Sequence, residues 1–231
     1  MAERVLWLLV GRGGSKSVPG KNLRRIGGRT LIEHKLGGAI AAGATDIVVS
    51  SDSAEIRGVA MHYGASREIV RPPELASDEA TTASVVRHAL ETLGESYDAV
   101  MLLECSTPYT RAATYQEALR MMTEKDADLV VGMRRSEPHT AFIGEQREDA
   151  SVTPIILQFQ RMARRRQDFA PLWTMSGGLY LFRTEMFLKT DDIYAGAPNI
   201  GVMQSRWEGL EIDTPDDLAL AEFAYERGYV C

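Results

Sequence analysis

The sequence predicts an α/β fold built on a mostly parallel sheet, and three observations favour this class. Apolar runs alternate with segments of helical spacing along the first 133 residues. The first apolar run, residues 5–10, is continuous, as in a strand buried on both faces of a parallel sheet. A glycine-rich turn follows that run directly. Regular alternation of strand and helix is typical of α/β proteins with a parallel sheet.

The remaining elements are expected in chain order after the strand at residues 5–10. Strands are predicted at residues 46–51, 99–103, 128–133 and 177–182, and helices at residues 31–42, 53–63, 81–93, 112–124 and 216–227. Ser53 is the expected N-cap of the second helix. The rhythm breaks at residues 134–174, where four arginines crowd together. We therefore expect a core of residues 1–133 and 175–231, and a β-rich extension of residues 134–174 that serves self-association.

Length and composition limit the class of protein further. A chain of 231 residues suggests one domain, or one with a sub-lobe. Hydrophobic residues at 45% and charged residues at 25% exclude a disordered or fibrous chain. A net charge of −6 argues against nucleic-acid binding, and two cysteines cannot form a disulfide framework, so the expected compartment is the cytoplasm. The apolar run at residues 5–10 is too short for a membrane span.

Charge is distributed unevenly along the chain. Residues 1–35 hold eight basic and two acidic side chains, a balance of +6, whereas residues 200–231 hold seven acidic and two basic ones, a balance of −5. The two ends could simply pair on the surface. Alternatively, the basic end binds an anion and the acidic end binds a cation that bridges to it.

The glycine-rich turn at residues 10–22 is suited to an anion. Its glycines let the backbone approach a ligand, and Arg12, Lys16 and Lys21 supply three cations that suit a polyphosphate. A Walker A loop is absent, and the dinucleotide fingerprint fails because Lys16 stands at its last glycine place. The turn is therefore neither a P-loop nor a Rossmann oxidoreductase motif, and from the turn alone phosphate binding and an ordinary basic turn stay equally open.

Near the carboxyl end, an acidic pair is predicted to hold a divalent metal ion. In extended chain, alternate side chains share a face, so Leu210 and Ile212 would face the core while Glu211 and Asp213 point outward together. Two adjacent carboxylates suit Mg²⁺ whose shell is completed by substrate phosphates. Helix capping accounts for the residues that follow, with Thr214 as N-cap, Pro215 at N1, and Asp216 and Asp217 in the first turn.

The glycine-rich segment resembles the signature of the cytidylyltransferases that activate 3-deoxy-2-keto sugar acids, the CMP-N-acetylneuraminate (acylneuraminate) synthetase family. Members carry A-R-x-x-S-K-x-x-P-x-K-N, and this chain matches it except for Gly11 in the alanine place. Residues 48–52, 71–78, 166–168, 177–180 and 212–217 resemble the family elements V-V-S-T-D, R-P-x-x-L-A-x-D, R-Q-D, N-G-A-I-Y and I-D-T-x-x-D. The likeness spans nearly the whole chain.

The resemblance implies a Rossmann-like fold of the nucleotide-diphospho-sugar transferase type with a small dimerisation lobe. It implies an enzyme that joins CTP to a sugar acid, releases pyrophosphate and needs Mg²⁺. The extension at residues 134–174 makes a homodimer the expected assembly. Catalysis would rest on Arg12, Lys16 and Lys21. The nucleotide would be bound by Gly11, Arg12, Gly13, Ser15, Lys16, Lys21, Asn22 and Arg71, the sugar acid by Glu104, Ser106, Arg166 and Tyr180, and the metal ion by Asp213 and Glu211. Without the resemblance, pairing of Arg71 with Glu74 is the preferred role.

Three positions depart from the family pattern. Glu104 stands where members have glutamine, Ser176 where they have asparagine, and Glu211 where they usually have aspartate. The acceptor therefore stays open among N-acetylneuraminate, legionaminic or pseudaminic acid, Kdn and other acidic sugars. Two other functions also stay open: a nucleotide-sugar-dependent glycosyltransferase, because Glu211-Ile212-Asp213 mimics a D-x-D motif, and an inactive nucleotide-binding homologue. The motifs name no general base, and ordinary packing roles are expected for the histidines and for Cys105.

Overall fold

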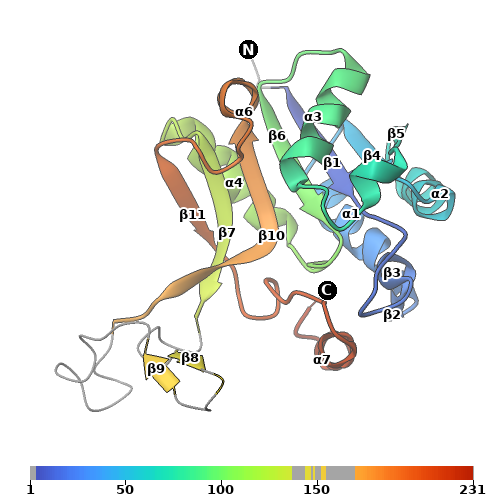
Figure 1. The fold of residues 1–231 in the computed structure, drawn as a ribbon, viewed down its shortest axis with the longest axis vertical. Helices are drawn as coiled ribbons and strands as arrows, with labels where there is room; N and C mark the ends of the chain where they lie inside the picture. Colours follow the sequence, from blue (N-terminus) through green and yellow to red (C-terminus); the bar gives the residue numbers. More distant parts are fainter. Residues whose placement is uncertain (1–3, 137–143, 147, 149–151, 155–169, 231) are drawn as a thin grey trace.

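A twisted sheet forms the centre of the protein. The computed structural model describes residues 4–136, 144–146, 148, 152–154 and 170–230, and these form a seven-stranded sheet in the order β11-β7-β10-β6-β1-β4-β5 (Figure 1). The strands are β1 (Val5–Val10), β4 (Ile47–Ser51), β5 (Arg67–Val70), β6 (Ala99–Glu104), β7 (Leu129–Arg135), β10 (Trp173–Arg183) and β11 (Asn199–Met203). Only β10 runs antiparallel to its neighbours within this sheet of the described residues, which confirms the mostly parallel α/β class.

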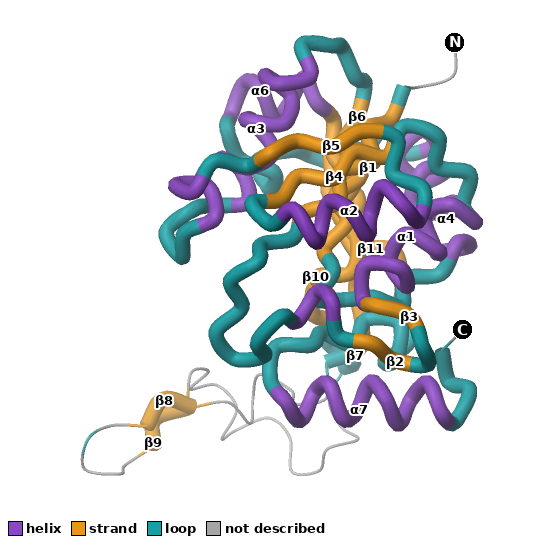
Figure 2. Tube along the Cα trace, turned by 90° about the vertical axis from the view of Figure 1, so that its right-hand side faces the viewer, coloured by secondary structure: helices purple, strands orange, loops and turns teal. Residues whose placement is uncertain are grey.

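Helices cover both faces of the sheet (Figure 2). One face packs against α1 (Leu31–Ala41), α2 (Ala54–Tyr63) and α4 (Ala112–Glu124), and the other against α3 (Thr82–Leu93) and α6 (Thr184–Thr190). In β1, Trp7 and Leu9 point to the first face, whereas Leu6 and Leu8 point to the second. The continuous apolar run is thereby explained, because successive side chains of this strand are buried on opposite faces.

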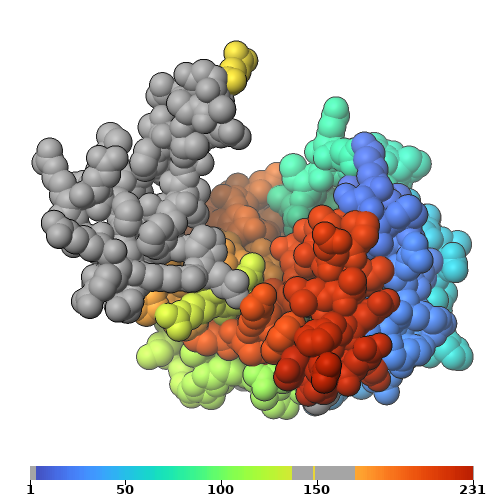
Figure 3. All heavy atoms as spheres, turned by 90° about the horizontal axis from the view of Figure 1, so that it is seen from below, coloured from blue at the N-terminus to red at the C-terminus, as the bar shows by residue number. Residues whose placement is uncertain are grey.

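A third apolar cluster joins the two ends of the chain. The hairpin of β2 (Arg25–Ile26) and β3 (Arg29–Thr30) lies beside α7 (Pro215–Glu226), and the short 3-10 helix η1 (Lys21–Leu23) precedes the hairpin. A second short 3-10 helix, η2 (Pro73–Ala76), lies between β5 and α3. Ile26, Ile212 and Ala221 are buried together in this cluster. Figure 3 shows the carboxyl-terminal segment in red directly beside the amino-terminal segment in blue. This packing fixes the acidic end of the chain next to the basic end.

The structure adds elements that periodicity alone does not predict. β5 is a short edge strand with charged residues, α6 has only 7 residues, and β11 contains a glycine, so each lacks a clear apolar period. The strand expected at residues 177–182 begins at Trp173 and shifts register between Met175 and Tyr180. A hairpin of β8 (Gly144–Gln146) and β9 (Val152–Pro154) lies apart from the sheet (Figure 1), and the role of residues 134–174 in self-association stays a prediction.

Local chemistry at the helix ends agrees with the sequence. Ser53 caps α2, and its hydroxyl accepts a hydrogen bond from the Ile56 backbone N–H. Thr214 and Asp217 form a reciprocal capping box at the start of α7, with Pro215 at the first helical position. Among the described residues, none of the helices has the length and apolarity that crossing a membrane requires.

Two neighbouring glycines of α1 provide a test of this packing. A methyl group at Gly38 would overlap the Thr110 carbonyl oxygen, whereas one at Gly37 would lie 3.4 Å from the Tyr63 hydroxyl, an ordinary contact. We expect Gly38→Ala to lower the free energy of unfolding by about 1–3 kcal/mol. The control Gly37→Ala should be neutral or stabilising by up to about 1 kcal/mol, because alanine favours helix. Equal effects in urea unfolding would contradict the close approach of α1 to the loop after β6.

Candidate functional site

A polar cleft opens where β1, β4 and β6 end. Because the carboxyl ends of parallel strands meet at one edge of a sheet, this edge is where α/β proteins bind ligands. The cleft has a volume of about 300 Å³. It is lined by Val10, Gly11, Arg12, Ser15, Lys21, Asn22, Arg71, Thr82, Glu104, Cys105, Ser106 and Glu211. An adjoining pocket of about 190 Å³ shares Arg12, Arg71 and Thr82 and extends along residues 75–82.

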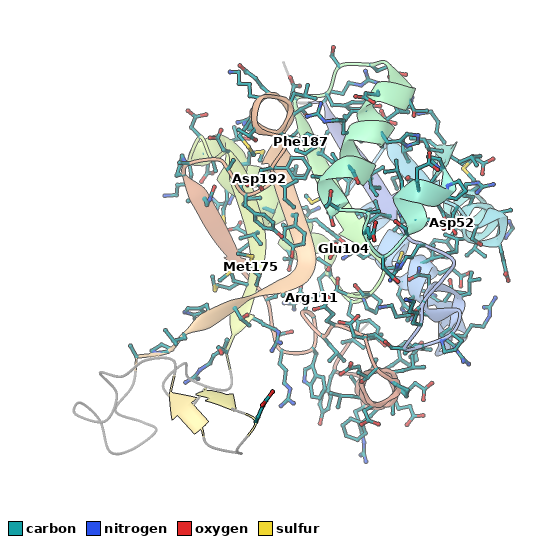
Figure 4. The ribbon with its side chains drawn as sticks, viewed as in Figure 1. Asp52, Glu104, Arg111, Met175, Phe187 and Asp192 are labelled. Carbon is teal, nitrogen blue, oxygen red and sulfur yellow. The ribbon has the colours of Figure 1, made fainter. Side chains whose placement is uncertain are left out.

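The glycine-rich loop is held in place from two sides. The Asn22 side-chain amide donates to the Arg12 carbonyl oxygen at 3.0 Å, and the Gly13 backbone N–H donates to Asp52 Oδ1 at 2.9 Å. Asp52 follows β4 and Glu104 ends β6, so both lie at the carboxyl edge of the sheet (Figure 4). A side chain at Gly11 would place its Cβ 3.1 Å from Asn22 Nδ2. Gly11 therefore lets the loop lie close to Asn22.

Each of the three predicted phosphate-binding cations contacts an acidic side chain. Asp78 accepts from Arg12 at 2.6 Å and from Lys16. Lys21 Nζ donates to Asp213 Oδ1 at 2.9 Å. The Lys21 side chain is only 16% exposed, whereas that of Lys16 is 81% exposed. Lys21 is thus the cation most firmly built into the cleft, and Lys16 is the most exposed of the three.

The contact between Lys21 and Asp213 unites the two oppositely charged ends of the chain. Asp213 follows the buried Ile212, whose backbone N–H donates to the Ser106 carbonyl oxygen at 2.8 Å. Glu211 and Asp213 are exposed on either side of Ile212, so the alternation predicted from the sequence is confirmed, although this stretch forms no strand. The loop after β1, the loop after β6 and the segment before α7 therefore meet around one cleft.

Carboxylates concentrate on the side of the cleft away from Asp52. The pKa of Glu104 is raised to about 7, chiefly by burial and also by nearby Glu211, against the opposing influence of Lys35 and Lys21. Although part of the Glu211 side chain is exposed, partial loss of hydration in the cleft and the Asp213 carboxylate raise its pKa as well. Gly177, with φ of +66°, leaves space beside both glutamates, since a Cβ there would lie 3.3 Å from Glu211 Oε1 and 3.6 Å from Glu104 Oε2.

The donor set suits Mg²⁺ better than a metal that needs a complete protein cage. No group of three or more His, Cys, Asp or Glu side chains within the described residues could hold a metal ion by itself. Two carboxylates of Glu211 and Asp213 that repel one another are nevertheless hard oxygen donors. Mg²⁺ usually takes one or two carboxylates and completes its shell with water and substrate phosphates. The residues present therefore fit an ion that arrives with a phosphorylated ligand.

Arg71 lies buried between the cleft and the adjoining pocket. Its guanidinium donates to the Ser50 carbonyl oxygen at 2.5 Å and to the Ser50 hydroxyl at 3.3 Å, and burial lowers its pKa. Among the ion pairs of the described residues, none joins Arg71 to Glu74. The structure thus favours a binding-site position for Arg71 over the loop pairing considered from the sequence.

Lys35 is a buried charge that the sequence motifs do not mark. It lies on α1 with no exposed surface and donates to Thr107 O at 3.0 Å, Thr110 Oγ1 at 3.0 Å and Gly178 O at 2.6 Å. Burial lowers its pKa to about 8, although Glu104 acts in the opposite direction. The one feature of the sequence that could have indicated its burial is its place on the apolar side of a helix, one turn after Leu31 and next to Leu36.

The other predicted residues occupy different surroundings. Ser15 and Ser106 line the cleft, and Arg166 falls outside the described residues. Tyr180 packs in the core on the α3 and α6 side, with its ring 6.0 Å from that of Tyr194. Cys105 is buried, and burial raises the pKa of its thiol to about 12, which disfavours a nucleophilic role. The described histidines do not line the cleft.

Taken together, the sheet order, the basic loop after the first strand and the acidic segment facing it define a nucleotide-binding α/β transferase. Comparison with known proteins identifies the family. Residues 7–190 match the family model described as cytidylyltransferase. The chain belongs to the cytidylyltransferase family, whose members are nucleotidyltransferases, and this confirms the resemblance seen in the sequence.

Curated relatives with similar sequences act on sugar acids, according to their names. The chain is 28% identical to the CMP-N,N'-diacetyllegionaminic acid synthase of Legionella pneumophila over 228 residues, which cover 95% of each chain. It is 27% identical to the pseudaminic acid cytidylyltransferase of Campylobacter jejuni, covering 96% of both. It is also 27% identical to the N-acylneuraminate cytidylyltransferase of Streptococcus agalactiae, of which it spans only 50% of the length.

Solved structures share the fold. The CMP:2-keto-3-deoxy-manno-octonic acid synthetase complexed with CTP superposes with a TM-score of 0.73 at 15% identity, covering 97% of this chain and 99% of that one. The 4-diphosphocytidyl-2C-methyl-D-erythritol synthase of Anaerococcus prevotii superposes with a TM-score of 0.66 at 11% identity, with the same coverage. These likenesses confirm the fold of the described core.

The raised pKa of Glu104 predicts a dependence of stability on pH. Between pH 4.5 and pH 7 the folded protein retains a proton on Glu104 that the unfolded chain releases, so this group makes stability fall as pH rises. Glu104→Gln removes that dependence. The variant should therefore gain stability relative to the unmodified protein from pH 5 to pH 8, by at most about 3 kcal/mol.

Urea unfolding at several pH values measures this difference. Glu91→Gln, at an exposed glutamate of α3, is the matched control and should follow the unmodified protein throughout. Parallel curves for Glu104→Gln and the unmodified protein would show that Glu104 titrates normally.

Proposed function

We propose that this chain transfers the CMP group of CTP to a 3-deoxy-2-keto sugar acid and releases pyrophosphate. The single observation that supports this most is the contact of Lys21 with Asp213 in one cleft, because it brings the expected phosphate-binding and metal-binding residues together. Family membership supports the nucleotidyl transfer. The names of the three relatives described above, which are a synthase and two cytidylyltransferases of sugar acids, support the class of acceptor.

The cations of the glycine-rich loop would bind the triphosphate. Arg12, Lys16 and Lys21 now contact the carboxylates of Asp78 and Asp213, so a triphosphate would exchange one set of anionic oxygens for another. The oxygen of the acceptor hydroxyl forms a bond to the α-phosphorus and releases its proton to solvent, and the bond from that phosphorus to the leaving pyrophosphate oxygen breaks. Positioning and neutralisation of the phosphate oxygens provide most of the rate enhancement in such transfers.

The cytosine of CTP and the sugar acid that accepts the CMP group would occupy opposite ends of the cleft. The adjoining pocket of Arg71, Ser77 and Thr82 is of a size and polarity to receive the cytosine. The sugar acid would lie near Glu104 and Ser106, on the side that β10 bounds. Arg166 would reach the carboxylate of the acceptor, and residues 134–174 would join two copies into a homodimer. The expected compartment is the cytoplasm.

Glu211 and Asp213 would hold Mg²⁺ together with the phosphates. The ion supplies charge neutralisation and orientation of the phosphate oxygens when it is bound. The repulsion between the two carboxylates, which raises the pKa of Glu211, gives a physical reason for a cation at this place.

Incubation with CTP, Mg²⁺ and a panel of sugar acids tests the proposal. The panel contains N-acetylneuraminate, legionaminic acid, pseudaminic acid and Kdn, and the readout is release of pyrophosphate. Turnover of a nucleotide sugar without use of CTP would favour the glycosyltransferase hypothesis. Binding of CTP without turnover of any acceptor would favour an inactive homologue.

Removal of one phosphate-binding cation should lower the rate strongly. We expect Lys21→Met and Arg12→Met each to reduce kcat/KM for CTP by about 10²–10³-fold, since each removes a charge that faces the transferred phosphate. Lys16→Met should cost less, because Lys16 is largely exposed. The control is Lys125→Met at the exposed end of α4. Activity of Lys21→Met equal to that of this control would contradict the phosphate-binding role.

Loss of a carboxylate should weaken the metal site. Asp213→Asn and Glu211→Gln should raise the Mg²⁺ concentration for half-maximal rate by about tenfold or more, because each removes an anionic oxygen donor. Asp216→Asn, at an exposed aspartate in the first turn of α7, is the control and should leave it unchanged. The reaction rate and the thermal stabilisation by CTP are each measured at increasing Mg²⁺ concentrations for the variants and the control. An unchanged Mg²⁺ requirement in both variants would place the metal elsewhere.

A further inference from the structure

Lys35 carries a charge into the interior of the protein. Its side chain has no exposed surface, and it lies on α1 between the apolar residues Ile32 and Leu36. A buried ammonium group is strongly unfavourable unless hydrogen bonds and an opposite charge offset the loss of water. The contacts of Lys35 must therefore offset the unfavourable free energy of burying its charge.

Three acceptors engage the ammonium group. Lys35 donates to Thr107 O and Thr110 Oγ1, in the loop after β6, and to Gly178 O, in β10. An ammonium group has three protons, so its donor capacity is fully used. Lys35 thus links α1 to the two segments that form the acceptor side of the cleft.

Those segments also set the position of Glu104. The Thr107 backbone N–H donates to the Glu104 carbonyl oxygen at 3.3 Å. The single proton of the Thr107 hydroxyl is shared between Gly177 O at 3.0 Å and Glu104 O at 3.3 Å. Gly177 leaves space beside Glu104 Oε2, as its missing side chain shows. Lys35 therefore braces the turn that begins at Glu104 and the bulge that faces its carboxylate.

Charge links the two residues as well. Glu104 is the strongest influence that favours the charged form of Lys35, ahead of Cys105 and Glu208. Lys35 is in turn the strongest influence that favours the charged form of Glu104, ahead of Lys21. Glu211 and Asp213 oppose ionisation of Glu104, and the Tyr115 ring of α4 lies 5.7 Å from Lys35 Nζ. The ammonium group of Lys35 and the carboxylate of Glu104 thus each favour the charged form of the other, against the burial that disfavours both charges.

We propose that Lys35 is a positioning residue that holds Glu104 as an ionised hydrogen-bond acceptor, so that the sugar acid must present a hydroxyl or N–H donor at this place. This inference rests on the proposed function. A glutamine, which the family pattern has here, both donates and accepts, whereas a carboxylate only accepts. The buried lysine thereby fixes which substituent of the acceptor is preferred.

A double-mutant cycle tests the charge link. Lys35→Met, Glu104→Gln and the double variant are compared with the unmodified protein at pH 7.5, by kcat/KM and KM for the acceptor, KM for CTP and the melting temperature. Lys35→Met should lower kcat/KM for the acceptor by about tenfold or more, because it leaves Glu104 without its counter-charge. KM for CTP should change less than twofold, because Lys35 contacts the segments on the acceptor side of the cleft. Adding Glu104→Gln should then restore part of the loss, although Glu104→Gln alone is harmful.

Additive effects would overturn the inference. If Glu104→Gln changes kcat/KM and the melting temperature by the same amounts with and without Lys35, then Lys35 is only a structural cross-link. Lys125→Met in place of Lys35→Met is the matched control and should be additive with Glu104→Gln. Failure of the proposed function has a different signature, since the unmodified protein would then turn over no sugar acid. A coupled melting temperature in that case would still support the charge link, and an additive one would overturn it.

Discussion

The ion pair between Lys21 and Asp213 is the contact on which the site depends. It joins residues from opposite ends of the chain, and it lies where the basic loop after β1 approaches the segment before α7. Because the Asp213 side chain is largely exposed, the pair contributes little stability by itself. The apolar cluster of Ile26, Ile212 and Ala221 holds the two segments together, so hydrophobic packing positions the charges and the charges define the chemistry.

Acidic side chains occupy the positions in which substrate oxygens are expected. Asp78 contacts Arg12 and Lys16, and Asp213 contacts Lys21. Three cations gathered in one loop would repel one another in the absence of a ligand, and these carboxylates offset that repulsion. Because the contacts are partly exposed, they are weak enough to be exchanged for a more highly charged anion.

Much of the fold and part of the site could be predicted from local pattern. The buried strand at β1, the N-cap Ser53, and the alternation of Ile212 with Glu211 and Asp213 all follow from short-range periodicity or capping chemistry. β11 and the bulge of β10 could not, because they depend on pairing with distant strands. The packing of Tyr180 in the core likewise depends on which face of β10 the bulge turns inward, and sequence spacing does not reveal that.

Lys35 shows most clearly what local pattern leaves out. A lysine on an apolar helix face can take either of two arrangements. Its stem can extend along the surface so that the ammonium group reaches water, or the ammonium group can be buried with hydrogen-bond partners. The choice depends on whether carbonyl oxygens from other segments converge on it, and here they come from residues 107 and 178, far away along the chain. The buried charge of Lys35 favours the ionised form of Glu104, which lines the cleft. A residue that no motif marks thus determines the charge that an acceptor meets.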